Sequence, residues 1–132
     1  MGQTLHSNWS ARGGSILRRF FYLEKRKIAG VGFQAADFAP SADKYAGRSC
    51  HGVRISVDDR LALDSPALGI ELIAALHHLY ADDFKIDATL PMVGSHRTLD
   101  KIKSGVEPER IVADWQPELE KFRIMRARYL LY

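Results

Sequence analysis

The spacing of apolar residues predicts the longest helix of the chain near its middle. Leucines recur there every three or four positions over residues 66–80, as one face of a helix requires. Ser65 and Pro66 favour a helix start at this point, with Ser65 as the N-cap and Pro66 at the first helical position. The leucines that define the predicted face are Leu68, Leu72, Leu76 and Leu79.

Upstream of this helix, the alternation of apolar and polar residues predicts two strands joined by a long loop. Residues 31–38 and residues 52–57 alternate in this way, and residues 39–50 between them are mostly small or polar. A shorter run over residues 84–88, just before a proline, predicts a third strand.

The first part of the chain divides into an irregular segment and a short helix. Residues 1–15 have no periodicity and are rich in Gly and Ser, which predicts a disordered leader. Residues 16–28 are predicted to form a helix, and Gly30 is placed to stop it. The apolar side of this predicted helix consists of Leu17, Phe20 and Phe21.

The last third of the chain is predicted to be helical. A short helix over residues 98–104 should end at Gly105, and Pro108 opens another helical turn. The closing helix begins near Gln116 and carries an apolar stripe that we expect to be buried. Because chain ends are normally polar, the apolar residues 129–132 indicate an end that packs against something. The expected stripe consists of Leu119, Phe122, Met125 or Arg126, and Tyr129.

Together these elements predict the α+β class, with a small two- or three-stranded sheet packed with several helices. The helices and strands cover residues 16–132, which we expect to form a single domain. At 132 residues, 46% hydrophobic and 27% charged, the composition is that of a globular protein large enough to bury its own core.

Charge is distributed unevenly along the chain. Residues 1–27 hold six Lys and Arg residues against one Glu, whereas the remaining residues hold thirteen against fifteen Asp and Glu. The formal net charge of +3 therefore describes the N-terminal segment and not the whole fold. A basic helix over residues 18–27 suggests contact with a polyanion, but a solvated helix face is the simpler interpretation, so nucleic acid is an unlikely partner.

The chain carries no readable targeting or membrane signal. Its longest early apolar run, residues 20–23, is far shorter than the core of a signal peptide, and no stretch approaches the length of a membrane span. The default expectation is a cytoplasmic protein without a membrane partner. The lone cysteine, Cys50, excludes an internal disulfide.

Two histidine patterns raise chemical possibilities that their spacing disfavours. His77 and His78 diverge by about 100° on a helix, so only one of them can face a centre shared with His96. We expect a surface pair of histidines and neither a metal nor a cofactor. Cys50 and His51 are adjacent at a strand start, where neighbours point to opposite faces, so His51 is badly placed to activate the thiol.

The carboxylates do not suggest a catalytic pair, although glycosidic hydrolysis usually requires two that face each other. Asp58-Asp59 and Asp82-Asp83 follow predicted elements, where acids usually form turns. Glu118 and Glu120 fall in the first turns of the closing helix, where the helix dipole favours them. We therefore expect no catalytic residue within this chain.

The loop over residues 39–50 is the best candidate for a binding site. It is long for a connection between adjacent strands, and it carries Lys44, Tyr45 and Arg48. An aromatic ring and two cations suit a sugar that bears an acid, because the ring can stack on the sugar and the cations can bind the carboxylate. The alternative is an exposed loop whose tyrosine covers the sheet edge.

The order and spacing of many small motifs resemble the C-terminal domain of the exo-β-N-acetylmuramidase family. The resemblance spans about residues 28–132, and the motifs are weak singly but fairly specific in combination. They are Phe38-Ala-Pro40, Lys44-Tyr-Ala-Gly47, Cys50-His-Gly-Val53, Asp59-Arg60, Pro66, Gly69, Gly94, Leu99, Ile102, Gly105, Pro108, Ile111, Trp115, Glu118-Leu119, Phe122, Arg126 and Tyr129-Leu-Leu-Tyr132.

The resemblance implies a part of a bacterial glycoside hydrolase that removes N-acetylmuramic acid from the non-reducing end of peptidoglycan fragments. The resemblance implies that family members, which are often extracytoplasmic, have a large Rossmann-like N-terminal domain that holds the catalytic carboxylate. We expect no counterpart of that domain within residues 1–132. We therefore expect a truncated or free-standing C-terminal domain that is inactive alone and forms one wall of a muropeptide site. Under this reading Lys44, Tyr45, Arg48 and His51 contact the sugar.

An alternative of a different class is an interaction module without a catalytic role. Removing a large neighbouring domain should leave an apolar face uncovered, and such faces associate. The partner would be a Rossmann-like domain on another chain, or a second copy of this chain in a homodimer.

Overall fold

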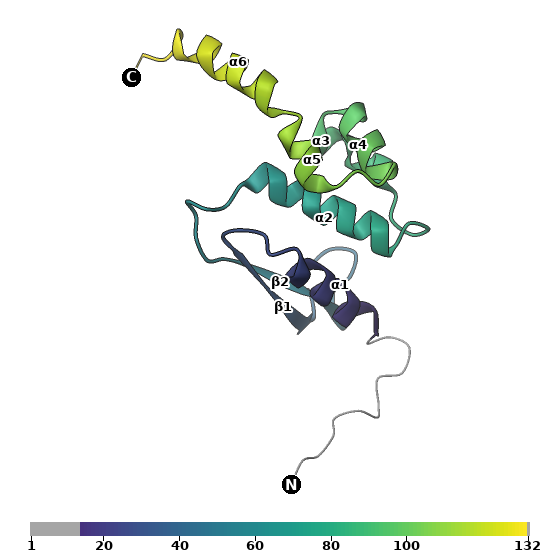
Figure 1. The fold of residues 1–132 in the computed structure, drawn as a ribbon. Coiled ribbons are helices and arrows are strands. Elements are labelled where there is room, and N and C mark those ends of the chain that lie inside the picture. The colour runs from purple at the N-terminus through teal and green to yellow at the C-terminus, as the bar shows by residue number, and fades with distance from the viewer. Residues whose placement is uncertain (1–13, 132) are drawn as a thin grey trace. The chain divides into compact units, whose positions relative to one another are not determined.

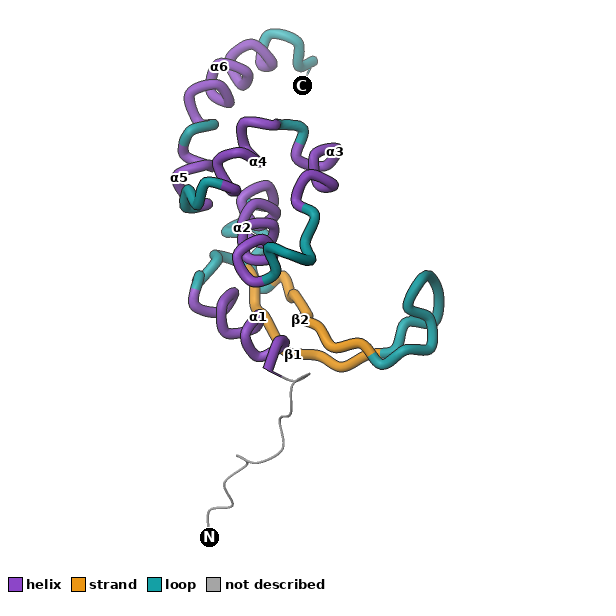
Figure 2. Tube along the Cα trace, turned by 90° about the vertical axis from the view of Figure 1, so that its right-hand side faces the viewer, coloured by secondary structure: helices purple, strands orange, loops and turns teal. Residues whose placement is uncertain are grey.

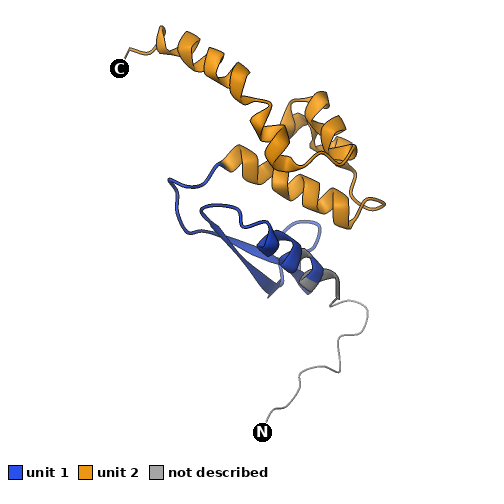
Figure 3. Ribbon diagram, in the orientation of Figure 1, with its two compact units in different colours: residues 1–64 blue, residues 65–132 orange. Residues whose placement is uncertain are grey.

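The computed structural model of the chain describes residues 14–131 (Figure 1). Figure 2 shows two strands and a series of helices, which confirms the predicted α+β class with a small sheet. The chain divides into two compact units, Met1–Asp64 and Ser65–Tyr132 (Figure 3). Most of the predicted leader, residues 1–13, lies outside the described residues.

The first unit is a helix packed on a β-hairpin. Helix α1 (Gly14–Lys25) contacts both β1 (Val31–Phe38) and β2 (Cys50–Val57), and the two strands pair antiparallel. The pairing runs from Val31 opposite Val57 to Phe38 opposite Cys50, without a bulge. Both predicted strands and the loop between them are therefore confirmed, and β2 begins two residues earlier than expected.

Helix α1 begins at Gly14, so residues 14 and 15 of the predicted leader are helical. The helix also differs from the prediction in its end and in its buried face. It ends at Lys25, because Lys27 has a left-handed backbone with φ 48°, and Gly30 follows with φ 77°. Leu23 is buried, whereas Phe21 is 51% exposed and Phe20 is half-buried. Helical spacing alone did not tell which of the neighbouring apolar residues would face the hairpin.

The second unit is entirely helical among its described residues. Among its elements, the sequence predicted the helix over residues 98–104 and the helical turn at Pro108. All of its elements are joined by short connections. They are α2 (Ser65–Leu79), the 3-10 helix η1 (Ile86–Thr89), α3 (Leu90–Val93), α4 (His96–Lys103), α5 (Pro108–Ala113) and α6 (Gln116–Ala127).

The core of the second unit draws on α2, η1, α4 and α5. Its largest fully buried side chains are Leu99 and Ile111, and Trp115 packs on it with part of its ring exposed. The buried residues of this cluster are Ile70, Ile86, Leu99, Ile102 and Ile111.

The core-facing side of α2 is not the predicted leucine face. Ile70, Ile73 and Ala74 pack in the core, whereas Leu76 is 37% exposed and the other three leucines are half-buried. Because α2 is apolar nearly all round, two faces satisfy the helical spacing, and the sequence pattern does not rank them.

The predicted third strand over residues 84–88 is wrong. These residues enter η1, in which Ile86 is buried and the Thr89 hydroxyl donates to the Ile86 carbonyl oxygen at 2.7 Å. Pro91 lies in the first turn of α3, where a proline is favoured, so it continues a helical segment instead of ending a strand.

Helix α4 begins and ends with the expected capping geometry. The Ser95 hydroxyl accepts a hydrogen bond from the Thr98 backbone N–H at 3.3 Å, and Gly105 follows the helix with φ 76°. The sequence placed the stop at Gly105 correctly but placed the start two residues late.

Helix α6 corrects the expectation of a buried closing helix. None of its residues is buried, and Figure 1 shows it extending from α5 away from the other helices of its unit. The predicted stripe is exposed: Leu119 by 36%, Phe122 by 52%, Met125 by 50% and Tyr129 by 79%. The core of the unit is formed without α6, so the described residues of the second unit leave the apolar stripe of this helix uncovered.

Candidate functional site

The loop that joins the two strands is an exposed, folded segment at one end of the hairpin. Residues 39–49 connect Phe38 with Cys50, and every residue from 41 to 49 is exposed. Figure 2 shows this loop in teal beyond the ends of the orange strands. The hairpin therefore presents the loop to solvent.

Backbone hydrogen bonds give the loop a defined shape. The Gly47 N–H donates to the Pro40 carbonyl oxygen at 2.9 Å, and the Ala46 N–H donates to the Asp43 carbonyl oxygen at 3.0 Å. Asp43 and Gly47 have positive φ values of 68° and 71°, which suit tight turns. These contacts close residues 40–47 into a compact loop that can position side chains.

The loop brings Lys44 and Tyr45 together. The Lys44 Nζ lies 5.5 Å from the centroid of the Tyr45 ring, within the range of a cation–π contact, and Tyr45 is 50% exposed. Arg48 joins this pair through its backbone, because its N–H donates to the Tyr45 carbonyl oxygen at 3.1 Å. Within residues 14–131 neither Lys44 nor Arg48 forms an ion pair, so both cations can bind an anion.

His51 lies on β2, one residue after the loop, and its side chain binds Asp37. The His51 Nδ1 is 2.5 Å from the Asp37 Oδ1. This contact leaves Nε2 of the half-exposed ring available to a ligand. Cys50 is half-buried opposite Phe38, and His51 is bound to a carboxylate, so the structure shows no thiol–imidazole pair.

The histidines do not form the predicted surface pair. His77 is half-buried on the same side of α2 as Ile70 and Ile73, and its Nδ1 is buried without a hydrogen-bond partner among the described residues. His78 is exposed. Within residues 14–131, no three His, Cys, Asp or Glu side chains gather as a metal site would require.

The carboxylates at the end of β2 form turns, as predicted. The Asp59 Oδ1 accepts hydrogen bonds from the N–H groups of Leu61 and Ala62 at 2.8 and 3.3 Å. The Ser56 hydroxyl donates to Asp58 at 2.9 Å. These contacts assign both acids to the chain reversal after the hairpin.

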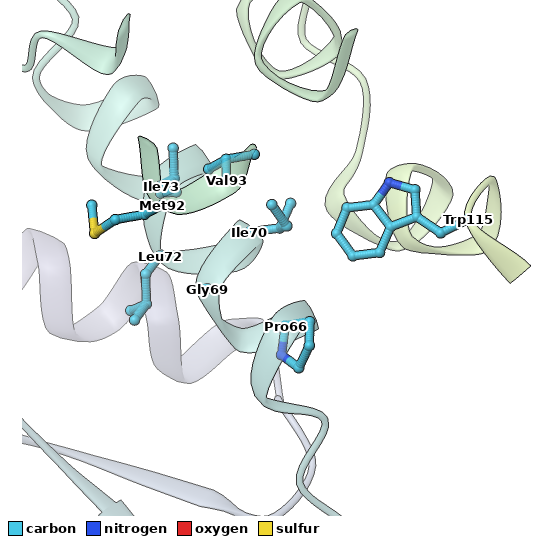
Figure 4. Close-up of a pocket in the computed structure, with 8 residues that line it drawn as sticks. All are labelled: Pro66, Gly69, Ile70, Leu72, Ile73, Met92, Val93 and Trp115. Carbon is cyan, nitrogen blue, oxygen red and sulfur yellow. The ribbon is translucent and has the colours of Figure 1, made fainter. Parts of the chain in front are cut away.

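The second unit contains a cavity of about 370 Å³ that the sequence analysis missed. Its lining is almost wholly apolar, and the Trp115 ring stands across the space from Ile70 (Figure 4). The signal that could have found it is the second apolar face of α2, which supplies most of the lining. The lining residues are Pro66, Gly69, Ile70, Leu72, Ile73, Met92, Val93 and Trp115.

Comparison with known proteins assigns the class of this α+β domain. Residues 15–132 match the family described as "Exo-beta-N-acetylmuramidase NamZ, C-terminal", and the chain belongs to this family. It is similar to the peptidoglycan beta-N-acetylmuramidase NamZ of Bacillus subtilis (strain 168), with 33% identity over 113 residues. The match covers 83% of this chain but only 27% of that relative. No solved structure matches the chain.

Within residues 14–131, no helix has the length and apolar character needed to cross a bilayer.

Proposed function

We propose that this chain is a non-catalytic domain that binds muropeptides carrying N-acetylmuramic acid through residues 39–51. Membership of the muramidase C-terminal family supports a peptidoglycan ligand. The single observation that supports this binding site is the folded loop that sets Lys44 beside the half-exposed Tyr45 ring. The Arg48 backbone is bonded to Tyr45, and its side chain forms no ion pair within residues 14–131.

The chemistry of the loop suits an acidic amino sugar. The Tyr45 ring offers an apolar face to the C–H groups of a sugar ring. The Arg48 guanidinium can bind the lactyl carboxylate of N-acetylmuramic acid with two parallel hydrogen bonds, and Lys44 adds a point charge. His51 Nε2 can donate to, or accept from, a hydroxyl or acetamido group.

The loop supplies one wall of a site and no hydrolytic machinery. Residues 41–49 are exposed, so the loop covers one side of a sugar and leaves its other side to another surface. Because the chain corresponds to 27% of its muramidase relative, we propose that the catalytic carboxylate belongs to the part of the relative without a counterpart here. The chain alone should therefore bind weakly and turn nothing over.

Titration of ¹⁵N-labelled protein tests this proposal. We expect N-acetylmuramic acid at millimolar concentration to shift the backbone signals of residues 40–51. N-acetylglucosamine, which has no lactyl carboxylate, should shift them less. Arg48→Gln should reduce the difference between the two sugars, and Tyr45→Leu should weaken both.

A matched control uses another exposed cation of the same hairpin. Arg54 lies on β2 outside the loop, so Arg54→Gln should leave both titrations unchanged. Equal shifts with both sugars, or no shifts at residues 40–51, would contradict the proposed site. Hydrolysis of a muropeptide by the purified chain would contradict the non-catalytic role.

A further inference from the structure

Helix α6 carries an uncovered apolar stripe that needs a partner. The α6 stripe consists of Leu119, Phe122 and Met125 on the helix and Tyr129 in the turn that follows it, and its members are 36–79% exposed. An isolated helix of twelve residues is marginal in water, because most helix stability comes from packing an apolar face. Three large exposed side chains on such a helix, with Tyr129 just after it, therefore indicate an interaction surface.

The stripe begins next to Trp115, which is the last of the described residues along the chain that packs on the core of the second unit. The Leu119 N–H donates to the Trp115 carbonyl oxygen at 2.9 Å, so Trp115 continues the helical spacing of the stripe by one turn. The Trp115 ring also lines the apolar cavity of the second unit (Figure 4). The stripe and the cavity therefore share one residue and form a connected apolar surface.

The charges on α6 indicate what covers the stripe. Glu118 and Glu120 lie in the first turns of the helix, and Arg126 and Arg128 lie at its end. Two copies of this helix side by side in parallel would place like charges together. Two antiparallel copies would place the acidic end of each beside the basic end of the other, with their helix dipoles also opposed.

We propose that α6 pairs antiparallel with α6 of a second copy of the chain, about a two-fold axis at Phe122. In this arrangement residues equally distant from Phe122 meet. Leu119 then packs on Met125, the Trp115 ring meets Tyr129 at the edge of the cavity, and the two Phe122 rings contact each other. All members of the stripe acquire an apolar partner, as a two-fold interface requires.

The same arrangement pairs charges that the single chain leaves unpaired. Glu118 and Arg126 lie four residues before and four residues after Phe122, on the side of the helix that carries the stripe. Because they are equally distant from Phe122, each faces the other across the interface. Within residues 14–131 neither of them forms an ion pair, whereas Glu120 is already 3.5 Å from Arg123 on its own helix. Glu118 and Arg126 therefore lie on the side of the helix that carries the stripe, whereas the pair of Glu120 and Arg123 does not need the second copy.

The interface should be weak because it is small. One helix of twelve residues from each copy buries less than the roughly 1,600 Å² of a standard interface. We therefore expect a reversible monomer–dimer equilibrium in the micromolar range or weaker.

Sedimentation equilibrium of the full chain from about 1 μM to 1 mM tests the pairing. We expect the mean mass to rise from monomer toward dimer. Phe122→Ala, Glu118→Arg and Arg126→Glu should each weaken the dimer about tenfold or more. Glu120→Lys reverses a charge on the side of the helix opposite Phe122, where its counterpart is the uncharged Ile124, and should leave the association unchanged.

The decisive experiment mixes the two charge variants. Glu118→Arg alone pairs arginine with arginine across the axis, and Arg126→Glu alone pairs glutamate with glutamate. An equimolar mixture makes both contacts attractive, so it should restore association to near the original strength. The double variant Glu118→Arg/Arg126→Glu should restore it in one chain.

Three outcomes would overturn the proposal. The first is a monomer at every concentration with native circular dichroism. The second is a dimer that the Phe122 and charge variants leave unchanged. The third is a mixture of the two charge variants that associates no better than either variant alone. That result would be expected if the stripe binds a different protein instead of a second copy. Because the loop titration reports on the first unit, either proposal can fail without the other.

Discussion

The His51 imidazole binds the carboxylate of Asp37, its own cross-strand partner, with Nδ1 and Oδ1 2.5 Å apart. These two residues are therefore neighbours both in the backbone pairing and through their side chains. Only one residue pair, Phe38 with Cys50, lies between them and the loop. Because Nδ1 contacts Asp37, Nε2 is the ring nitrogen of His51 that would face a ligand at the proposed site.

Replacing Asp37 should change His51 more than it changes the stability of the fold. The pair is solvent-exposed, so Asp37→Asn should lower the free energy of unfolding by less than about 1 kcal/mol. The ¹⁵N signals of the His51 ring should move clearly, because Nδ1 loses a charged partner. A large loss of stability in urea titration, with unchanged ring signals, would contradict this account.

Two glycines with similar backbone angles should respond differently to alanine. At Gly30 (φ 77°) an added Cβ would lie 2.4 Å from the Asp59 carbonyl oxygen, whereas at Gly47 (φ 71°) it would meet nothing within 4 Å. Gly47→Ala should therefore cost about 1–2 kcal/mol or less, from left-handed strain alone. Gly30→Ala should cost clearly more. Urea unfolding of both variants checks this order, and an equal cost would contradict it.

Replacing a buried leucine of the core by alanine should lower stability much more than the same replacement on helix α6. Leu99 is 1% exposed and Leu119 is 36% exposed. Leu99→Ala should cost about 2–5 kcal/mol, because it leaves a cavity among well-packed residues. Leu119→Ala should cost less than about 1 kcal/mol in a dilute monomer. Thermal unfolding at low micromolar concentration measures both, and similar losses would show that α6 supports the core.

Asp114, which follows α5, should contribute to stability in a pH-dependent way. A hydrogen bond from the Lys101 ammonium group lowers the pKa of Asp114, and the charges of Lys101, Arg97 and Arg110 lower it further. Because the pKa is lower in the folded than in the unfolded chain, the carboxylate stabilises the fold above the unfolded pKa of about 3.9. That contribution should disappear as pH falls through the lowered value.

The comparison of wild type with Asp114→Asn isolates this effect. The wild-type protein should be the more stable at pH 6, and the difference in urea midpoint should shrink steadily below about pH 4. Lys101→Met should remove most of the same difference, because it removes the principal cause of the shift. A gap that is constant with pH would show that the Asp114 contact is structural and not electrostatic.

The sequence predicted the local geometry of this chain well. Alternation found the strand over residues 31–38 at its observed bounds, and a glycine found the end of α4. Both signals depend on neighbours within a few positions, namely the period of the strand and the left-handed backbone that a glycine allows. The resemblance to the muramidase family also held, since it depends on many such positions in order.

The sequence could not predict what each apolar face contacts. Helix α2 has two apolar faces, and the leucine face was chosen over the one that carries Ile70. For α6 the sequence predicted the position of the stripe correctly but wrongly predicted that it would be buried. Amphipathic spacing indicates which face of a helix is apolar but not what packs against that face. The contact between Lys44 and Tyr45 was likewise beyond the pattern, since it depends on the turns of the loop.

Because α6 contributes no residue to the described core, different residues can determine the folding of the second unit and its association. Substitutions in Leu99 or Ile111 should act on whether the second unit folds, and under the proposed pairing substitutions in Phe122 or Arg126 should act on association. Under that proposal, mutations that alter association can accumulate on α6 without lowering the stability of the core. Natural selection, or a protein designer, could therefore change the sequence of α6 without changing the core of the second unit.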